Sequence, residues 1–161
     1  MAFLQACGVG GGQEPQEQRY YLVKDGQVLA NMTYTGWTMF AESIQNLVAP
    51  TYSNNIVYMT TTQGKCSCVL GTTSAINLTQ YNSIVVRAKA PATPYGLAGL
   101  YLSPGTTNIG SNTEPHVFIT GDVFDEFELD LSEINTSKYI EVLCYDDRDI
   151  QMTDLYLTYY M

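Results

Sequence analysis

The chain has 161 residues, 45% of them hydrophobic and 14% charged, so it is long enough for one compact domain with a buried core. A formal net charge of -9, from 16 acidic and 7 basic residues, argues against nucleic acid and anionic membranes as partners. No apolar run approaches the roughly 18 to 20 residues that span a bilayer. The thirteen tyrosines, with few helix-favouring residues, are typical of an all-β protein.

Residues 1–19 differ from the rest of the chain and are expected to form a flexible N-terminal arm. Several glycines are followed by a polar run that has no alternating pattern to bury. The arm begins with four apolar residues, Met1, Ala2, Phe3 and Leu4. An apolar tip on a flexible tether predicts a peptide that docks on a neighbouring protein, and a frayed terminus is the alternative.

From residue 20 onward, polar and apolar residues alternate in short runs separated by turn residues. Asp25 and Gly26 lie between two such runs and predict a two-residue hairpin turn. Residues 41–48 are expected to form a helical turn or an irregular crossing. Strands are predicted at residues 20–24, 27–33, 36–40, 55–60, 65–70, 83–89, 99–102, 116–120, 126–131, 139–145 and 152–160.

The run from Glu126 to Leu131 shows the alternation most clearly, because Phe127, Leu129 and Leu131 alternate with three carboxylates. This pattern predicts an antiparallel strand with one face in the core and one acidic face in solvent. About ten strands without a useful helix pattern predict two packed antiparallel sheets. We therefore expect residues 20–161 to form a jelly-roll-like β-sandwich.

The cysteines and the single histidine do not have the spacing of a metal site. Cys66 and Cys68 point to the same face if they lie in a strand, and Cys144 lies in an apolar run, so buried, reduced thiols are expected. His116 has no partner at ligand spacing, and it is expected to be structural or exposed. The acidic residues 146–149 are interpreted as a turn, with calcium binding as the alternative. No metal or cofactor is therefore expected.

The chain offers few residues for catalysis. Asp122, Asp125, Glu126 and Glu128 are dense enough to suggest a glycoside hydrolase with two carboxylates. The strand alternation places the richest part of this cluster on the solvent face, so an acidic surface is the preferred interpretation. We expect a protein that is not an enzyme.

Aromatic residues suggest a binding function instead. Trp37, Tyr95 and Tyr101 lie beside turns or on the polar side of a strand, where an exposed ring could stack on a sugar. Burial in the core or in a subunit interface is the alternative for each of them.

Short motifs in the chain form a pattern of their own. Residues 76–81 read isoleucine-x-leucine-threonine-x-tyrosine at the entry to a strand, and residues 130–132 read aspartate-leucine-serine at the exit from one. The related motifs lie at residues 21–26, 35–37, 74–86, 127–134, 139–142 and 154–157. In these motifs the chain resembles jelly-roll-like β-sandwich structural and accessory proteins of tailed phages and prophages of gut Firmicutes.

This resemblance implies a virion protein made in the cytoplasm of a bacterial host. It implies a capsid decoration or head accessory subunit, a head fibre or a tail component, with other virion proteins as partners and a homo-oligomer, most simply a trimer. The arm would then dock each copy on the particle. The alternative is a glycan-binding domain for host recognition in the tail or baseplate, which resembles a carbohydrate-binding module. The pattern carries no catalytic residues.

Overall fold

A computed structural model describes residues 11–34, 38–39, 46–61, 66–111 and 113–161 of the chain. Every regular element among these residues is a β-strand, and none is a helix long and apolar enough to cross a membrane. The strands are β1 (Glu17–Lys24), β2 (Gln27–Val28), β3 (Met32–Tyr34), β4 (Thr38–Met39), β5 (Asn46–Leu47), β6 (Thr51–Ser53), β7 (Ile56–Met59), β8 (Cys66–Thr72), β9 (Ile76–Asn77), β10 (Ser83–Ala90), β11 (Leu97–Ser103), β12 (Thr107–Ile109), β13 (His116–Phe118), β14 (Gly121–Asp130), β15 (Ser137–Tyr145) and β16 (Ile150–Tyr160).

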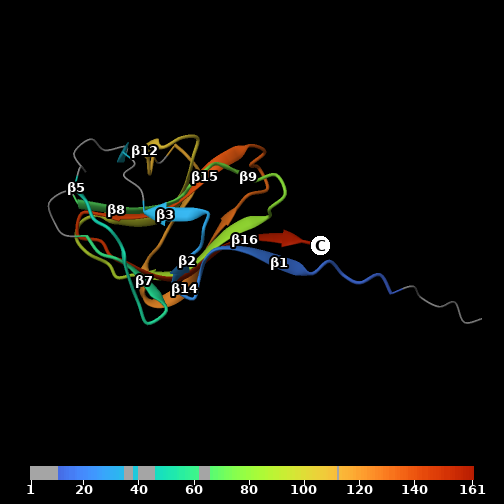
Figure 1. The fold of residues 1–161 in the computed structure, drawn as a ribbon, viewed down its shortest axis with the longest axis horizontal. Coiled ribbons are helices and arrows are strands. Elements are labelled where there is room, and N and C mark those ends of the chain that lie inside the picture. Colours follow the sequence, from blue (N-terminus) through green and yellow to red (C-terminus); the bar gives the residue numbers. More distant parts are fainter. Residues whose placement is uncertain (1–10, 35–37, 40–45, 62–65, 112) are drawn as a thin grey trace, which may run out of the picture.

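Apart from β4 and β12, which pair with each other in parallel, the strands form two sheets that pack face to face, as the sequence predicts (Figure 1). Both sheets are antiparallel except for the short parallel pairing of β5 with β8. Sheet A has the order β14-β10-β16-β1-β2, and β7 and β6 extend it beside β16. Sheet B has the order β13-β11-β15-β8-β3, with the short strands β5 and β9 at its margins. The strands outnumber the expected ten because several have only two or three residues.

The core lies between the sheets and contains the apolar side chains from one face of each long strand. On β14, Phe127 and Leu129 pack against this core, whereas Glu126, Glu128 and Asp130 are exposed, which confirms the predicted alternation. The residues predicted as one strand at 27–33 divide between the sheets, because β2 pairs with β1 and β3 pairs with β8. The chain crosses from one sheet to the other in the turn between them.

Two of the cysteines lie in this core as free thiols. Cys68 on β8 is directly opposite Cys144 on β15, and neither is exposed to solvent. Burial raises the pKa of the Cys68 thiol to about 12 and raises that of Cys144 well above its usual value. The prediction of buried thiols is confirmed for this pair, and the side chain of Cys66 lies outside the described residues.

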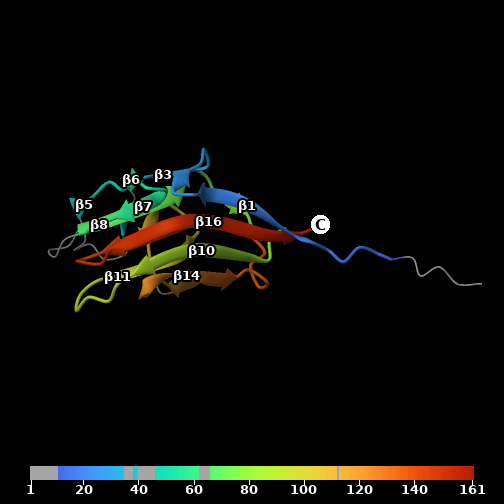
Figure 2. The ribbon, with the colours of Figure 1, turned by 90° about the horizontal axis from the view of Figure 1, so that it is seen from below.

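The chain ends of the domain are paired with each other. β1 begins at Glu17, three residues before the expected boundary, because the end of β16 supplies a partner strand. The backbone amide of Gln16 donates to the carbonyl of Met161 at 3.1 Å, which continues this pairing. In Figure 2 the two strands lie side by side, and β1 starts where β16 ends, close to the labelled C-terminus. The predicted docking residues 1–4 lie outside the described residues.

The two outer faces of the sandwich differ in their exposure. On sheet B, a second buried cluster contains Val69, Tyr101, Ile109 and Leu143, all without exposed surface. Ile109 comes from β12, which lies on the side of sheet B that faces away from sheet A (Figure 1). The connection between β11 and β13 therefore covers this face.

The same covered face contains a buried carboxylate. Glu141 on β15 has no exposed surface, and the Ser103 hydroxyl contacts its Oε1 atom. Ser103 Oγ also donates to the carbonyl of Gly105 at 2.8 Å, and one hydroxyl proton can serve only one acceptor. Both contacts can be hydrogen bonds if Glu141 is protonated. Burial, with a smaller effect from Glu114, raises the pKa of Glu141 to about 8.

We predict that Glu141 makes the protein less stable as the pH rises. Because the folded state holds this proton up to about pH 8 and the unfolded state loses it near pH 4.5, the free energy of unfolding falls across that interval. One such proton contributes a slope of about 1.4 kcal/mol per pH unit. Urea denaturation at several pH values should show a weaker fall for Glu141→Gln than for the parent. Equal slopes in the two proteins would contradict a neutral Glu141.

The hairpin turn between β1 and β2 gives a second prediction. Asp25 and Gly26 both have positive φ angles, 50° and 70°, as the predicted two-residue turn requires. A Cβ atom on Gly26 would lie 2.1 Å from the carbonyl carbon of Asn55. Gly26→Ala should therefore lower the free energy of unfolding by about 1–3 kcal/mol in urea denaturation. Gly105→Ala is the matched control, since its Cβ has open space, and it should change stability by less than about 0.5 kcal/mol.

Candidate functional site

The structure places the three aromatic candidates from the sequence in different environments. Tyr95 is 50% exposed in the turn between β10 and β11, as its predicted role requires. Tyr101 is fully buried, which contradicts a role as a glycan or interface residue and agrees with the alternative of burial. It does lie on the outer side of β11, but the connection that carries Ile109 covers that side. Trp37 lies outside the described residues.

The outer face of sheet A is the uncovered side of the sandwich. In Figure 2, β16, β10 and β14 lie side by side toward the viewer, and no described strand lies across them. Charged and aromatic side chains occupy this surface. We call it the open face and define it by Arg19, Tyr21, Lys24, Arg87, Lys89, Phe124, Glu126, Glu128, Asp154 and Tyr156.

Strand register brings these residues into rows across the sheet. Val85 on β10 is opposite Glu128 on one side and Tyr156 on the other, and Tyr156 is in turn opposite Tyr21. Side chains alternate between the two sides of a strand, so residues that pair in register share a face. The residues on either side of each of these positions point into the core. Alternate residues of β1, β10, β14 and β16 therefore form the open face.

Two tyrosine rings lie at the centre of the β1 and β16 side of this face. The ring centroids of Tyr21 and Tyr156 are 5.2 Å apart, with an angle of 49° between the planes. The guanidinium carbon of Arg19 lies 4.4 Å from the Tyr156 centroid, and the ammonium of Lys24 lies 5.1 Å from the Tyr21 centroid. Each ring therefore attracts a cation to its π face. Tyr156 is only 3% exposed, whereas Tyr21 keeps part of its ring in solvent.

Hydrogen bonds hold this group in place. The Tyr156 hydroxyl donates to Glu126 Oε1 at 3.3 Å, which connects β16 to β14 across the intervening β10. Burial raises the pKa of Tyr156 to about 12, and the Glu126 carboxylate adds to this rise. A hydrogen bond with Tyr21 is the main cause that raises the pKa of the Arg19 guanidinium. The hydroxyl of Tyr156 and the cation of Arg19 thus both persist at neutral pH.

A third ring lies at the other margin of the open face. Phe124 on β14 has the ammonium of Lys89 at 5.1 Å from its centroid and the guanidinium carbon of Arg87 at 5.9 Å. β1 and β14 are separated by three strand spacings of about 4.8 Å, roughly 14 Å across the sheet, and Phe124 also lies four residues along β14 from Glu128, which is in the row of Tyr21 and Tyr156. The open face can therefore contact an extended ligand at two aromatic positions.

The carboxylates of Glu126 and Glu128 lie on the open face, where they can accept hydrogen bonds, whereas Asp125 is opposite the core residue Ala88 and lies on the other side of β14. Asp122, Asp125, Glu126 and Glu128 are exposed, in agreement with the predicted acidic surface. Among the residues that the structure describes, no group of three or more histidine, cysteine, aspartate and glutamate side chains is placed to hold a metal ion. Asp146 and Asp147 form a turn with positive φ angles. The carboxylate of Asp149 accepts a hydrogen bond from the amide of Thr61 at 2.9 Å.

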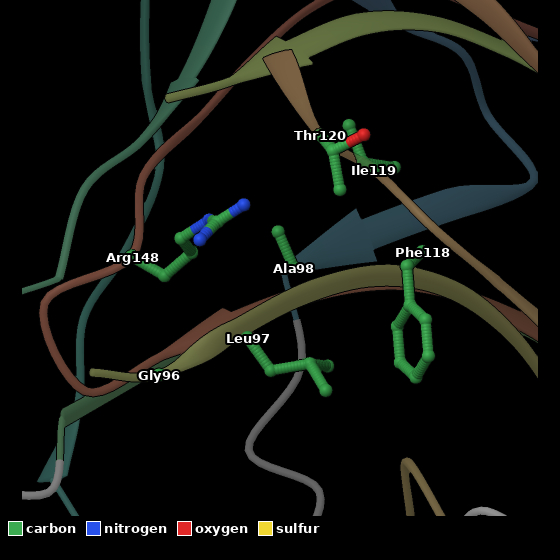
Figure 3. Close-up of a pocket in the computed structure, with 7 residues that line it drawn as sticks. All are labelled: Gly96, Leu97, Ala98, Phe118, Ile119, Thr120 and Arg148. Carbon is green, nitrogen blue, oxygen red and sulfur yellow. The ribbon is translucent and has the colours of Figure 1, made fainter. Parts of the chain in front are cut away.

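A small pocket of about 190 Å³ lies at one end of the sandwich, beside Arg148 (Figure 3). The Arg148 side chain reaches into it toward Ala98 and Thr120. Arg148 Nη2 donates to the carbonyl of Ala90 at 3.2 Å, which ties the turn before β16 to the end of β10. His116 lies elsewhere, stacked on Tyr101 with centroids 4.9 Å apart. Both basic residues have structural partners, and neither lies on the open face.

Sequence reasoning missed Tyr21, Tyr156 and Arg19. The alternation in residues 155–158 does contain a signal, because Leu155 and Leu157 belong to the core and Tyr156 lies between them. The missing information was the strand register, which brings Tyr21 and Tyr156 together across 135 positions of sequence (156 minus 21).

Neither the comparison with family models nor that with curated proteins finds a match for this chain.

Solved structures with the same fold are known. A family 29 carbohydrate-binding module from Piromyces equi has a TM-score of 0.56 and 11% identity, over 89% of this chain and 91% of that one. A lysine variant of a second family 29 module, complexed with cellulohexaose, has a TM-score of 0.52 and 10% identity over 88% and 91%. An aspartate variant complexed with mannohexaose has a TM-score of 0.54 and 11% identity over 89% and 92%. At this identity the similarity shows the fold: the chain is an antiparallel β-sandwich of the kind these modules have.

Proposed function

We propose that this protein is a non-catalytic glycan-binding module and that it binds a polysaccharide chain along the open face. The observation that carries the proposal is the cluster of Tyr21, Tyr156 and Arg19 on an uncovered sheet. The partly exposed ring of Tyr21 offers an apolar surface for the C–H side of a sugar ring. The guanidinium of Arg19 and the carboxylate of Glu126, which contact the ring and the hydroxyl of Tyr156, offer donors and acceptors for sugar hydroxyls.

The substitutions made in the similar structures support the proposed glycan binding, because they replace the same types of residue that lie on the open face. Structures of family 29 modules include variants in which an aspartate, a lysine, a tyrosine or an arginine is replaced, and several of these variants probe ligand recognition. The open face presents the same kinds of side chain on neighbouring strands. With 10–12% identity, the argument rests on residue chemistry and not on aligned positions.

The mixed charge of the open face favours an uncharged ligand. Arginine and lysine side chains alternate with glutamate and aspartate across it, so no large area of one sign is available for a charged polymer. Sugar hydroxyls can donate to the carboxylates and accept from the cations at the same time. The two aromatic groups are separated both across and along the strands, which suits an extended chain of several sugar rings.

The role in a virion and the trimer stay predictions from the resemblance in the sequence. None of the similar structures described above is a virion protein. A glycan-binding domain of a host-recognition apparatus is compatible with both the resemblance and the open face.

We predict that Tyr21→Ala weakens glycan binding at least about ten-fold, because it removes the exposed ring of the central pair. Isothermal titration calorimetry of the full chain with cellohexaose and mannohexaose measures this effect. Tyr21→Phe should retain more binding than Tyr21→Ala, since it keeps the ring.

Tyr95→Ala is the matched control, because it removes an exposed tyrosine that lies in a turn away from the open face. It should bind like the parent. Loss of binding in Tyr95→Ala with full binding in Tyr21→Ala would overturn the assignment of the open face. Absence of binding to either sugar, and to a panel of neutral polysaccharides, would overturn the proposed function.

A further inference from the structure

A second group of tyrosines forms a pocket on the other side of the same two strands. Tyr20, Gln80, Tyr81 and Tyr159 line a hollow of about 260 Å³, which we call the tyrosine pocket. The Tyr20 and Tyr81 ring centroids are 6.2 Å apart, and those of Tyr81 and Tyr159 are 5.9 Å apart in an edge-to-face arrangement. The three rings are thus inclined to one another and form walls, not a flat platform.

The tyrosine pocket and the open face are on opposite sides of sheet A. Tyr20 pairs with Leu157, which belongs to the core, whereas the next residue, Tyr21, pairs with Tyr156 on the open face. Tyr159 follows Leu157 by two positions, so it shares the core side of β16. The pocket therefore lies where the core side of sheet A reaches solvent, next to the paired chain ends.

Each wall of the pocket is held by the backbone or by a hydrogen bond. β1 and β16 fix Tyr20 and Tyr159, and the Asn31 side chain donates to the Tyr20 hydroxyl. Tyr81 packs against the core, and its amide donates to the carbonyl of Leu78 at 3.1 Å. Gln80 is exposed at the rim, where its amide can both donate and accept. A ligand would find this site already formed, which reduces the entropy lost on binding.

The chemistry of the lining selects the ligand. None of the four lining residues carries a charge, although the chain as a whole carries a net charge of -9. The volume is below the roughly 300–1,000 Å³ of pockets that enclose drug-sized ligands. Aromatic walls with hydroxyl and amide groups match a small polyhydroxylated ring. We propose that the tyrosine pocket binds a single uncharged sugar ring, as a free sugar or at the end of a glycan. The tyrosine pocket and the open face would both bind sugars, but they have no residue in common. An experiment can therefore contradict one site and leave the other supported.

The test is a titration of the isotope-labelled full chain with glucose, mannose and cellobiose, followed by NMR. We expect saturable shifts in the Gln80 side-chain amide and the Tyr81 backbone amide, with a Kd on the order of 1–10 mM. Tyr81→Ala should weaken this binding at least about ten-fold. Gln80→Ala replaces an exposed rim residue, so it should keep the fold and weaken binding by a smaller factor. Tyr21→Ala should leave these shifts unchanged while it impairs hexasaccharide binding.

Three results would overturn the proposal. The first is the absence of saturable shifts at the pocket with all three sugars. The second is sugar-induced shifts that persist unchanged in Gln80→Ala and in a folded Tyr81→Ala protein. The third is tighter binding of choline than of any sugar, because aromatic walls can also hold a quaternary ammonium ion. Loss of hexasaccharide binding in Tyr21→Ala alone would concern the open face and leave the tyrosine pocket supported.

Discussion

The pairing of β1 with β16 is the contact on which both aromatic surfaces depend. It joins the beginning and the end of the described domain, from Glu17 opposite Tyr160 to Val23 opposite Leu155. Because successive residues of a strand point to opposite sides, this one register places Tyr21 beside Tyr156 on the open face and brings Tyr20 and Tyr159 to the other side. A shift of β1 by one residue would exchange the faces of Tyr20 and Tyr21 and would turn the core residue Leu22 toward solvent.

The difference between the two outer faces is the reason for placing the proposed glycan site on sheet A. Sheet B is covered by the connection between β11 and β13. Burial on this sheet costs free energy of folding, because three polar atoms have no hydrogen-bond partner among the described residues: Ser67 Oγ, the Tyr101 hydroxyl and Glu141 Oε2. Sheet A keeps its polar outer side in water. Its long charged side chains cover Val85 and Tyr156, which are buried, whereas Tyr21 and the charged groups keep exposed surface on the sheet.

Local sequence patterns predicted turns and strands, whereas burial of single side chains, strand pairing and the tyrosine clusters depend on long-range contacts. The Asp25 and Gly26 turn and the alternation from Glu126 to Leu131 were predicted correctly, because both depend only on neighbouring residues. For Tyr101 the sequence left exposure and burial open, since nothing near it in the sequence shows that the connection carrying Ile109 folds over it. The strand position of residues 17–19 was missed for the same reason: their polar sequence has no pattern of its own, and β16 supplies their hydrogen bonds. Of the candidate site, only the acidic side of β14 could be predicted from the sequence, because the tyrosine clusters depend on register.

The alternation of core and outer positions along the strands also explains the low sequence identity to the similar structures. A β-sandwich core needs apolar side chains of suitable volume at alternate positions, and many sequences meet that requirement, so 10–12% identity is sufficient for a common fold. The outer positions of the same strands are free of the packing constraint, and they can change without loss of the fold. Ligand specificity in such a domain is therefore determined by a few outward-facing side chains per strand. In this chain the outward-facing side chains of β1, β16 and β14 include tyrosine, arginine and glutamate, and their direct contacts, from Arg19 over Tyr156 to the Tyr156 hydroxyl on Glu126, make the open face one connected surface.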